Sequence, residues 1–157
     1  MSIVYYLQHR IQYATRADRK GIGAFRSFAK AQAAIKQVGG MPGFKRTTGR
    51  FSIYACELDR TYLPDGLDTP SNLANGDVPG RNEFGPNDDV YVAYWDDEDR
   101  DDVSVQFGYY STRDLAQAAL VEAEPHIPDA KRGVFDVSTS RLDRVEWSEG
   151  FGSDDDE

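Results

Sequence analysis

The chain has 157 residues, a formal net charge of −9 and 39% hydrophobic residues, and 12% of all residues are aromatic. This composition is sufficient for a packed core and excludes wholesale disorder. No run approaches the roughly 18 apolar residues of a membrane-spanning helix, and the N-terminal stretch lacks the basic region and cleavage site of a signal peptide. The single Cys56 excludes an internal disulfide, so we expect a cytoplasmic protein.

The charge is divided unequally along the chain. Residues 1–67 hold eleven Lys or Arg and four Asp or Glu, a net charge of +7. Residues 88–157 hold six Lys or Arg and twenty Asp or Glu, a net charge of −14. Two interpretations stay open: the halves attract each other and have solvated outer faces, or the acidic half binds something basic.

In the first half, a continuous apolar run predicts a strand buried on both faces at residues 3–7. A polar, basic connection follows at 8–19, and then a second strand at 20–25. A helix at 28–38 and a third strand at 50–58 complete this half. Ser27 can cap the helix by accepting a hydrogen bond from the free amides of its first turn. Apolar residues recur at helical spacing and should face a sheet: Phe28, Ala31, Ile35 and Val38.

Residues 59–87 are rich in Pro, Gly, Asn and Asp and have no hydrophobic period, which predicts a linker or a long surface loop. The pattern then restarts with a strand at 90–95, an acidic loop at 96–102 and an alternating strand at 103–109. A helix at 115–123 and a last strand from 135 onward follow. The stretch from Ser111 to Asp114 is similar to a capping box at the start of the helix.

One stretch of sequence occurs twice, at a shift of 84 residues. The segments 49–67 and 133–151 share a first glycine, a Phe two residues later, the triplet Leu-Asp-Arg and a late glycine. Each copy therefore has the order β-β-α-β, and such a thin unit needs a second sheet to cover it. We predict an α+β fold of two tandem β-β-α-β repeats that form a pseudo-dimer, with about six strands and two helices.

The predicted organisation is a basic first repeat at 1–67 and an acidic second repeat at 88–151, joined by a linker or loop at 68–87. An acidic tail follows at 152–157. The two sheets could join edge to edge or stack face to face, and the sequence leaves both open. Successive side chains of a strand point to opposite faces, and this alternation places Leu58 and Leu142 on the other face from the apolar residues before them. Either the strands end near Ala55 and Thr139 or a bulge resets the phase, and we favour the strand ending.

No group of residues has the spacing of a catalytic or metal site. His9 and His126 have no spaced partner, and Cys56 lies in a predicted strand, where a small buried hydrophobe is the usual role. The segment Gly21-Ile-Gly23 lacks the third glycine of a phosphate-binding fingerprint. We therefore predict no catalytic residue, no metal ligand and no cofactor.

The acidic hairpin of the second copy is the predicted functional surface, because carboxylates and tryptophans could cover a basic surface of another protein. The predicted partner-binding residues are Trp95, Asp96, Asp97, Glu98, Asp99, Asp101, Asp102 and Trp147. A calcium loop is less well supported, because the central glycine and the late bidentate glutamate of an EF-hand are missing. A merely solvated acidic loop is the structural alternative.

The first copy carries a basic loop in the corresponding place, with Arg10, Arg16, Arg19 and Lys20. Basic side chains near an aromatic residue, here Tyr13, are typical of nucleic-acid contacts, but the overall negative charge opposes phosphate binding. We therefore expect no direct contact with nucleic acid and none with a membrane.

A further set of motifs runs through the first copy in a fixed order: Gly23-Ala-Phe25, Ser27, Ala31-Gln-Ala-Ala-Ile35, Pro42-Gly-Phe44, Gly49-Arg-Phe-Ser-Ile53 and Glu57-Leu-Asp59. The second copy better retains the aromatic ending, Trp147-Ser-Glu-Gly-Phe151. Together these motifs resemble a small uncharacterised bacterial domain family in tandem duplication. The resemblance covers both repeats but not the linker or tail, and it implies a fold and no known activity.

These observations favour a non-enzymatic protein-binding module. More narrowly, small size, acidity and the missing catalytic residues suggest an inhibitor or immunity protein that neutralises a bacterial toxin through an acidic surface. One alternative is a small hydrolase or transferase with a site in the groove between the repeats, where His9 or His126 would meet carboxylates. Another is a DNA-mimic regulator, whose carboxylates would be spaced like phosphates.

Overall fold

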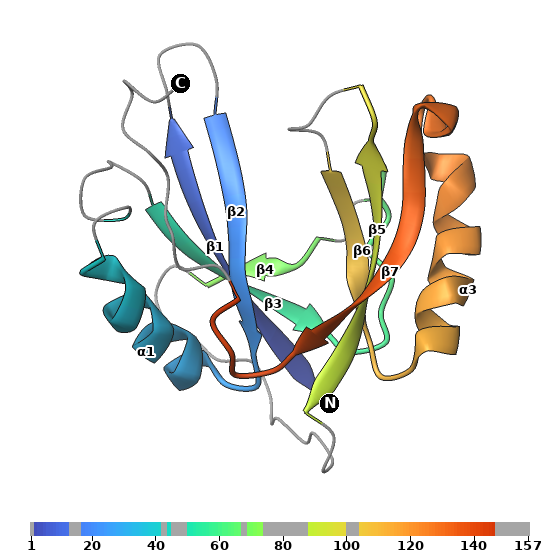
Figure 1. The fold of residues 1–157 in the computed structure, drawn as a ribbon. Helices are drawn as coiled ribbons and strands as arrows, with labels where there is room; N and C mark the ends of the chain where they lie inside the picture. The colour runs from blue at the N-terminus through green and yellow to red at the C-terminus, as the bar shows by residue number, and fades with distance from the viewer. Residues whose placement is uncertain are drawn as a thin grey trace.

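The computed structural model describes residues 2–12, 17–41, 44, 50–66, 69–73, 88–99 and 104–146. Within them the chain forms two antiparallel sheets and two α-helices, joined as shown in Figure 1. The fold class is therefore α+β, as the sequence predicts. The described part contains seven strands, one more than expected, because a two-residue strand forms inside the predicted linker.

The first sheet, sheet A, has the strand order β2-β1-β3-β4. Its strands are β1 (Ile3–Gln12), β2 (Ala17–Phe25), β3 (Arg50–Glu57) and the edge strand β4 (Ser71–Asn72). Helix α1 (Phe28–Gly39) covers one face of it and buries Ala-rich turns and Val38 there. The cap is the predicted one, since the Ser27 side chain accepts a hydrogen bond from the Lys30 amide at 3.2 Å.

The second sheet, sheet B, has the strand order β6-β5-β7. Its strands are β5 (Asp89–Asp97), β6 (Ser104–Tyr110) and β7 (Gly133–Arg141). Helix α3 (Arg113–Ala123) covers one face and continues into two short 3-10 turns, η1 (Glu124–His126) and η2 (Ala130–Arg132). In both sheets the third strand is antiparallel to the first, so the handedness rule for parallel crossovers does not apply.

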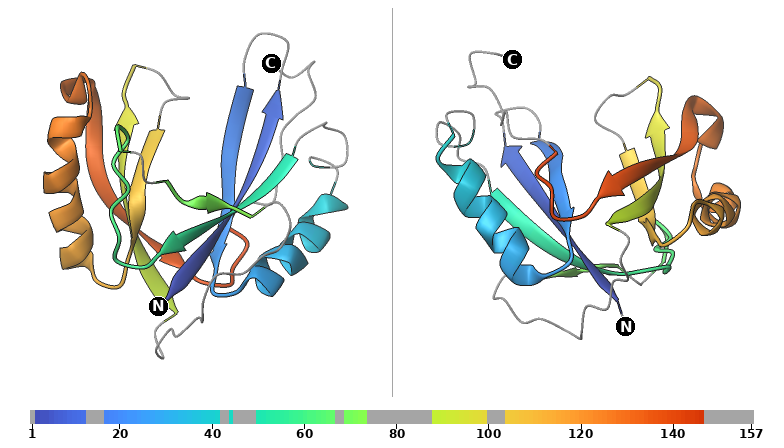
Figure 2. Two further views of the ribbon diagram at one scale, coloured as in Figure 1. Left: turned by 180° about the vertical axis from the view of Figure 1, so that it is seen from behind. Right: turned by 60° about the horizontal axis from the view of Figure 1, so that its bottom comes forward.

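The two sheets stack face to face, and the helices lie on the two outer sides (Figures 1 and 2). The inner faces share a core of small and aromatic side chains: Val4, Ala24, Cys56, Tyr62, Val90, Val92, Tyr109 and Leu142. Each outer face has a separate core under its own helix. This settles the choice between edge-to-edge and face-to-face packing, which the sequence leaves open.

The turn that follows the third strand of each sheet reaches across to the opposite sheet. After β3, the amide of Asp59 donates to the Tyr109 carbonyl of sheet B at 2.8 Å. After β7, the amide of Asp143 donates to the Ala24 carbonyl of sheet A, also at 2.8 Å. A second pair of bonds repeats the exchange three residues later, from Tyr62 to Phe107 and from Glu146 to Ile22. The sheets are thus joined by two matching pairs of backbone contacts.

The predicted connection at 8–19 is wrong, because β1 continues to Gln12 and β2 begins at Ala17. His9 and Ile11 are buried on the helix side, whereas Gln8 and Arg10 lie on the other side, so the strand is polar on one face only. The second helix, predicted at 115–123, begins two residues earlier at Arg113, and its cap lies one residue after Ser111. Its cap is Thr112, whose side chain accepts from the Leu115 amide at 3.2 Å.

The expected strand endings near Ala55 and Thr139 are wrong, and neither β3 nor β7 contains a bulge in its pairing with the central strand. Strand β3 continues past Ala55 to Glu57, and β7 continues to Arg141. Both sheets are covered on both faces, so Leu58 and Leu142 simply pack on the face between the sheets while the preceding apolar residues face a helix.

Candidate functional site

The inner faces of the two sheets enclose a groove of about 820 Å³. It is lined by residues of both sheets and by the segment that leads into β4: Tyr6, Gln8, Arg19, Lys20, Gly21, Tyr54, Cys56, Tyr62, Thr69, Pro70, Ser71, Asn72, Ser104, Gln106, Gly108 and Tyr109. A ligand of drug size fits a cavity of this volume. The groove is therefore the candidate site for a small ligand.

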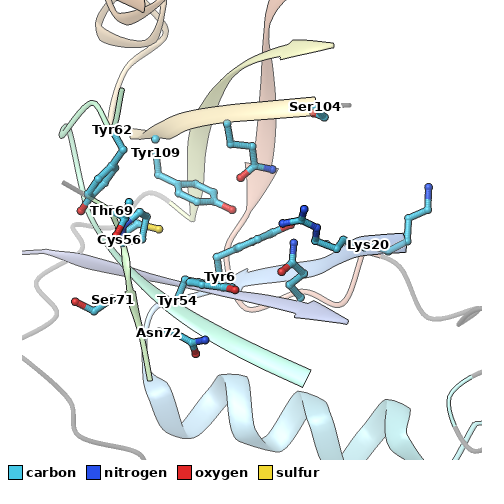
Figure 3. A pocket seen from close by; sticks show the side chains of 16 residues that line it. Tyr6, Lys20, Tyr54, Cys56, Tyr62, Thr69, Ser71, Asn72, Ser104 and Tyr109 are labelled. Carbon is cyan, nitrogen blue, oxygen red and sulfur yellow. The ribbon is translucent and has the colours of Figure 1, made fainter. Parts of the chain in front are cut away.

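Tyrosines form the floor of the groove. Figure 3 shows Tyr109 extending from β6 toward Tyr6 on sheet A, and their ring centroids are 6.2 Å apart. Tyr54, next to Tyr6 across the β1–β3 pair, lies at a centroid distance of 6.4 Å from it. Gly21 makes room for this arrangement, because a Cβ at that position would lie 2.6 Å from the Tyr6 hydroxyl. The floor thus combines aromatic faces with hydroxyl groups.

The inner faces of the two sheets carry opposite charge. On sheet A, Arg10 lies in register with Arg19 on one side and Arg50 on the other. On sheet B, Asp96 and Asp136 lie on the inner face, beside Tyr94. A second cavity of about 300 Å³ reaches this acidic side and is lined by Tyr94, Asp96 and Glu146, among others.

The titratable groups on the floor are held neutral. Burial raises the pKa of the Cys56 thiol to about 12. Burial also raises the pKa of Tyr6 to about 12, assisted by the nearby Cys56 and opposed by a side-chain hydrogen bond with Gln8. Desolvation raises the pKa of Tyr109 well above its ordinary value. None of these groups is ionised near pH 7, so the floor offers hydrogen bonds and not a nucleophile.

The histidines lie away from the groove. His9 is buried on the helix side of sheet A, where its ring packs 4.7 Å from Phe51 and 5.0 Å from Phe44. The Nδ1 atom of His126 lies 2.8 Å from an oxygen of Asp65 at the protein surface. Among the described lining residues of either cavity there is no histidine, and the described residues contain no group of three or more His, Cys, Asp or Glu side chains arranged to hold a metal ion.

The predicted partner-binding residues fall into three groups. Trp95 and Asp97 are only 3% and 5% exposed, so their side chains lie inside the fold. The Trp95 indole donates to the Ala130 carbonyl at 3.1 Å, and an Asp97 oxygen accepts from Arg132 at 3.2 Å. Asp96, Glu98 and Asp99 are exposed, and Asp101, Asp102 and Trp147 lie outside the described residues.

The outer face of α3 is a candidate site that sequence reasoning missed. Leu115 and Val121 are 45% and 74% exposed there, next to the exposed carboxylates of Asp114 and Glu122. Aligning the helix caps Ser27 and Thr112 places Lys30 and Lys36 of α1 at the positions of Leu115 and Val121. The apolar pair is visible in the sequence as a departure of the second helix from the first.

An acidic surface continues beyond this helix. Exposed carboxylates follow from α3 through η1 to the end of the β5–β6 hairpin: Glu122, Glu124, Asp129, Glu98 and Asp99. Arg132 connects the two parts, because its carbonyl accepts from the Glu98 amide at 2.8 Å and its side chain binds Asp97. We call these five carboxylates, together with Leu115 and Val121, the acidic face.

No protein-family model, no curated protein and no solved structure matches this chain. No helix in the described part of the chain is long and apolar enough to cross a membrane.

Proposed function

We propose that the chain is a non-enzymatic protein-binding module whose acidic face binds a basic surface of another protein. The observation that carries this proposal is the exposure of Leu115 and Val121 among carboxylates, at positions where the first helix has lysines. Exposed apolar residues beside charged ones are typical of binding sites, since the apolar part supplies affinity and the charges speed association.

We also propose that the two halves are tandem copies of one bacterial β-β-α-β unit and form a pseudo-dimer. This second proposal supports the first. Matching bonds from Asp59 and Asp143, matching helix caps and matching pairing irregularities after Leu7 and Ala93 favour duplication. A duplicated unit leaves one copy to maintain the fold while the surface of the other changes. The differences between the copies, basic against acidic, are then where a partner would bind.

The partner class follows from the charge. The second half carries a net charge of −14, so a basic protein is attracted to it and a nucleic acid or an anionic membrane is repelled. An inhibitor or immunity protein that neutralises a bacterial toxin in the cytoplasm fits this chemistry. The enzymatic alternative needs a histidine beside carboxylates in the groove, and the described lining residues supply none.

Affinity capture from the native host with matched variants tests the proposal. One variant carries Glu122→Gln and Glu124→Gln on the acidic face, and the control carries Asp89→Asn and Asp136→Asn on sheet B, which removes the same charge elsewhere. We expect the partner to be a basic protein whose affinity falls steeply with added salt. Its affinity for the first variant should be about tenfold lower or more, and the control should bind it like the original chain. Equal binding by all three proteins, at all salt concentrations, would contradict the proposal.

A second variant tests the apolar part. Leu115→Ser with Val121→Ser removes both exposed apolar side chains without changing the net charge, and neither position belongs to the buried core. We expect the dissociation rate of the captured partner to rise while the salt dependence of association stays the same.

A further inference from the structure

Three arginines lie side by side across three neighbouring strands of sheet A. Arg10 on β1 is in register with Arg19 on β2 and with Arg50 on β3. Residues in register on adjacent strands are about 5 Å apart, and like charges placed directly opposite one another are destabilising. An anion bound between Arg10 and Arg50 would offset the repulsion between these two side chains.

The row faces the groove between the sheets. Strand β1 pairs with β3 without irregularity, so Arg10 lies on the same face as Tyr6 and Gln8, which line the groove. By the same alternation, Arg50 lies on the face of Tyr54. Arg10 and Arg50 are exposed, and neither forms an ion pair with any residue that the structure describes.

The remaining surface next to the row suits a flat, polar ring. Tyr6 and Tyr54 offer aromatic rings, and Gln8 and Gln106, which also line the groove, offer both donors and acceptors. Aromatic side chains stack on the rings of bases, and arginine forks bind phosphate oxygens in pairs. Along β1 the order is tyrosine, glutamine, arginine, so the ring would lie deep in the groove and the anion at its mouth.

We propose that the open end of this groove binds a small anion that carries a flat ring, with the size and chemistry of a nucleoside monophosphate. The phosphate lies against Arg10 and Arg50, and the base lies on Tyr6 and Tyr54. The site is independent of the acidic face on α3, so either proposal can fail without the other.

The acidic residues on the opposite sheet favour a small ligand over a nucleic-acid chain. Asp96 and Asp136 on the inner face of sheet B repel a second and third phosphate, whereas a single phosphate is placed on the arginine side. The volume of about 820 Å³ is in the range of sites for small ligands. A polymer would need a basic track that continues along both walls.

Isothermal titration of the full chain with adenosine and guanosine monophosphate tests this site. We expect at least one nucleotide to bind with one-to-one stoichiometry, and adenosine or inorganic phosphate alone to bind much more weakly. Arg10→Gln and Arg50→Gln should each weaken nucleotide binding about tenfold, because each removes charge-assisted hydrogen bonds. Lys36→Gln, an equal change of charge on the outer face of α1, should leave the affinity unchanged.

Several outcomes would overturn the inference. One is the absence of saturable binding of both nucleotides at millimolar concentration, and another is an equal loss in the Lys36→Gln control. If inorganic phosphate bound as tightly as the nucleotides, the base would have no site. Tighter and strongly salt-dependent binding of a single-stranded oligonucleotide would replace the small ligand with a polymer. All variant positions are exposed, and circular dichroism verifies that each variant is folded.

Discussion

Asp59 and Asp143 adopt the same left-handed backbone conformation, each with φ of 64°, at the ends of β3 and β7. Each of them binds the backbone at the start of the helix in the opposite layer. An Asp59 oxygen accepts from the Ser111 amide at 2.7 Å, and an Asp143 oxygen accepts from the Arg26 amide at 3.0 Å. The two aspartates thus connect the two sheet-and-helix layers in a matching way.

Asp59→Ala should lower the free energy of unfolding by about 2 kcal/mol, because alanine is strained at positive φ and leaves the Ser111 amide without its acceptor. Asp59→Asn should lower it by less than about 1 kcal/mol, since asparagine tolerates this conformation and keeps one acceptor oxygen. Chemical denaturation of both variants measures the difference. Equal losses for alanine and asparagine would show that neither the conformation nor the acceptor matters.

Asp143 should contribute to stability in acid. Its partial burial opposes ionisation, but hydrogen bonds from the Arg26 amide and from the Lys30 and Arg26 side chains outweigh this, so its pKa is below the ordinary value. A carboxyl whose pKa is lowered by folding stabilises the protein above its unfolded pKa, about 4, and this contribution is lost as the pH falls through the folded value.

Denaturation between about pH 5 and pH 2 measures this contribution. In Asp143→Asn the decline of stability toward low pH should be shallower than in the original chain. The exposed Asp89→Asn is the control and should leave the slope unchanged. A slope that is the same in all three proteins would mean that the Asp143 ion pairs contribute nothing.

Gly108 and Gly39 should respond to alanine in opposite directions. Gly108 has a φ of 153°, and an added Cβ would clash with the Arg60 carbonyl where the turn after β3 crosses to β6, so Gly108→Ala should destabilise by about 3 kcal/mol. Nothing lies within 4 Å of an added Cβ at Gly39, the last residue of α1, so Gly39→Ala should stabilise by roughly 0.5 kcal/mol. Thermal unfolding distinguishes the two, and a mild effect at Gly108 would argue against the close contact.

Cys56 should be inert in the folded protein. Burial raises the pKa of its thiol to about 12, so at pH 8 its thiolate is roughly a thousandfold rarer than in an unfolded chain with an ordinary thiol. Iodoacetamide should label the native protein far more slowly than the protein in denaturant, as followed by mass spectrometry. Rapid labelling of the native chain would place the thiol in contact with solvent.

Local patterns predict much of the fold. The helix at 28–38 and its Ser27 cap depend on contacts between near neighbours, and the structure confirms both. The length of the first hairpin is not predicted, because alternation in β1 becomes clear only when a helix covers one face. His9 looks polar in the sequence but lies between Phe44 and Phe51.

The candidate sites depend on contacts between distant residues. From the sequence, Asp97 is expected to be one of a run of solvated carboxylates. In the structure it is buried and accepts a hydrogen bond from Arg132, 35 residues later. The arginine row requires the register of β1 against both neighbours, and β2 contains an extra residue opposite Leu7 and Gln8 that shifts that register. Neither relationship follows from the spacing of residues along one strand.

Hydrogen–deuterium exchange of the chain, alone and bound to its captured partner, most directly tests the central claim that the acidic face is the binding surface. We predict slower exchange in α3 and at the end of the β5–β6 hairpin, because docking suppresses the local opening through which amides exchange. Helix α1, which has lysines at the matching positions, should exchange at the same rate in both states and serves as the internal control. Protection confined to α1, with α3 unchanged, would contradict the claim.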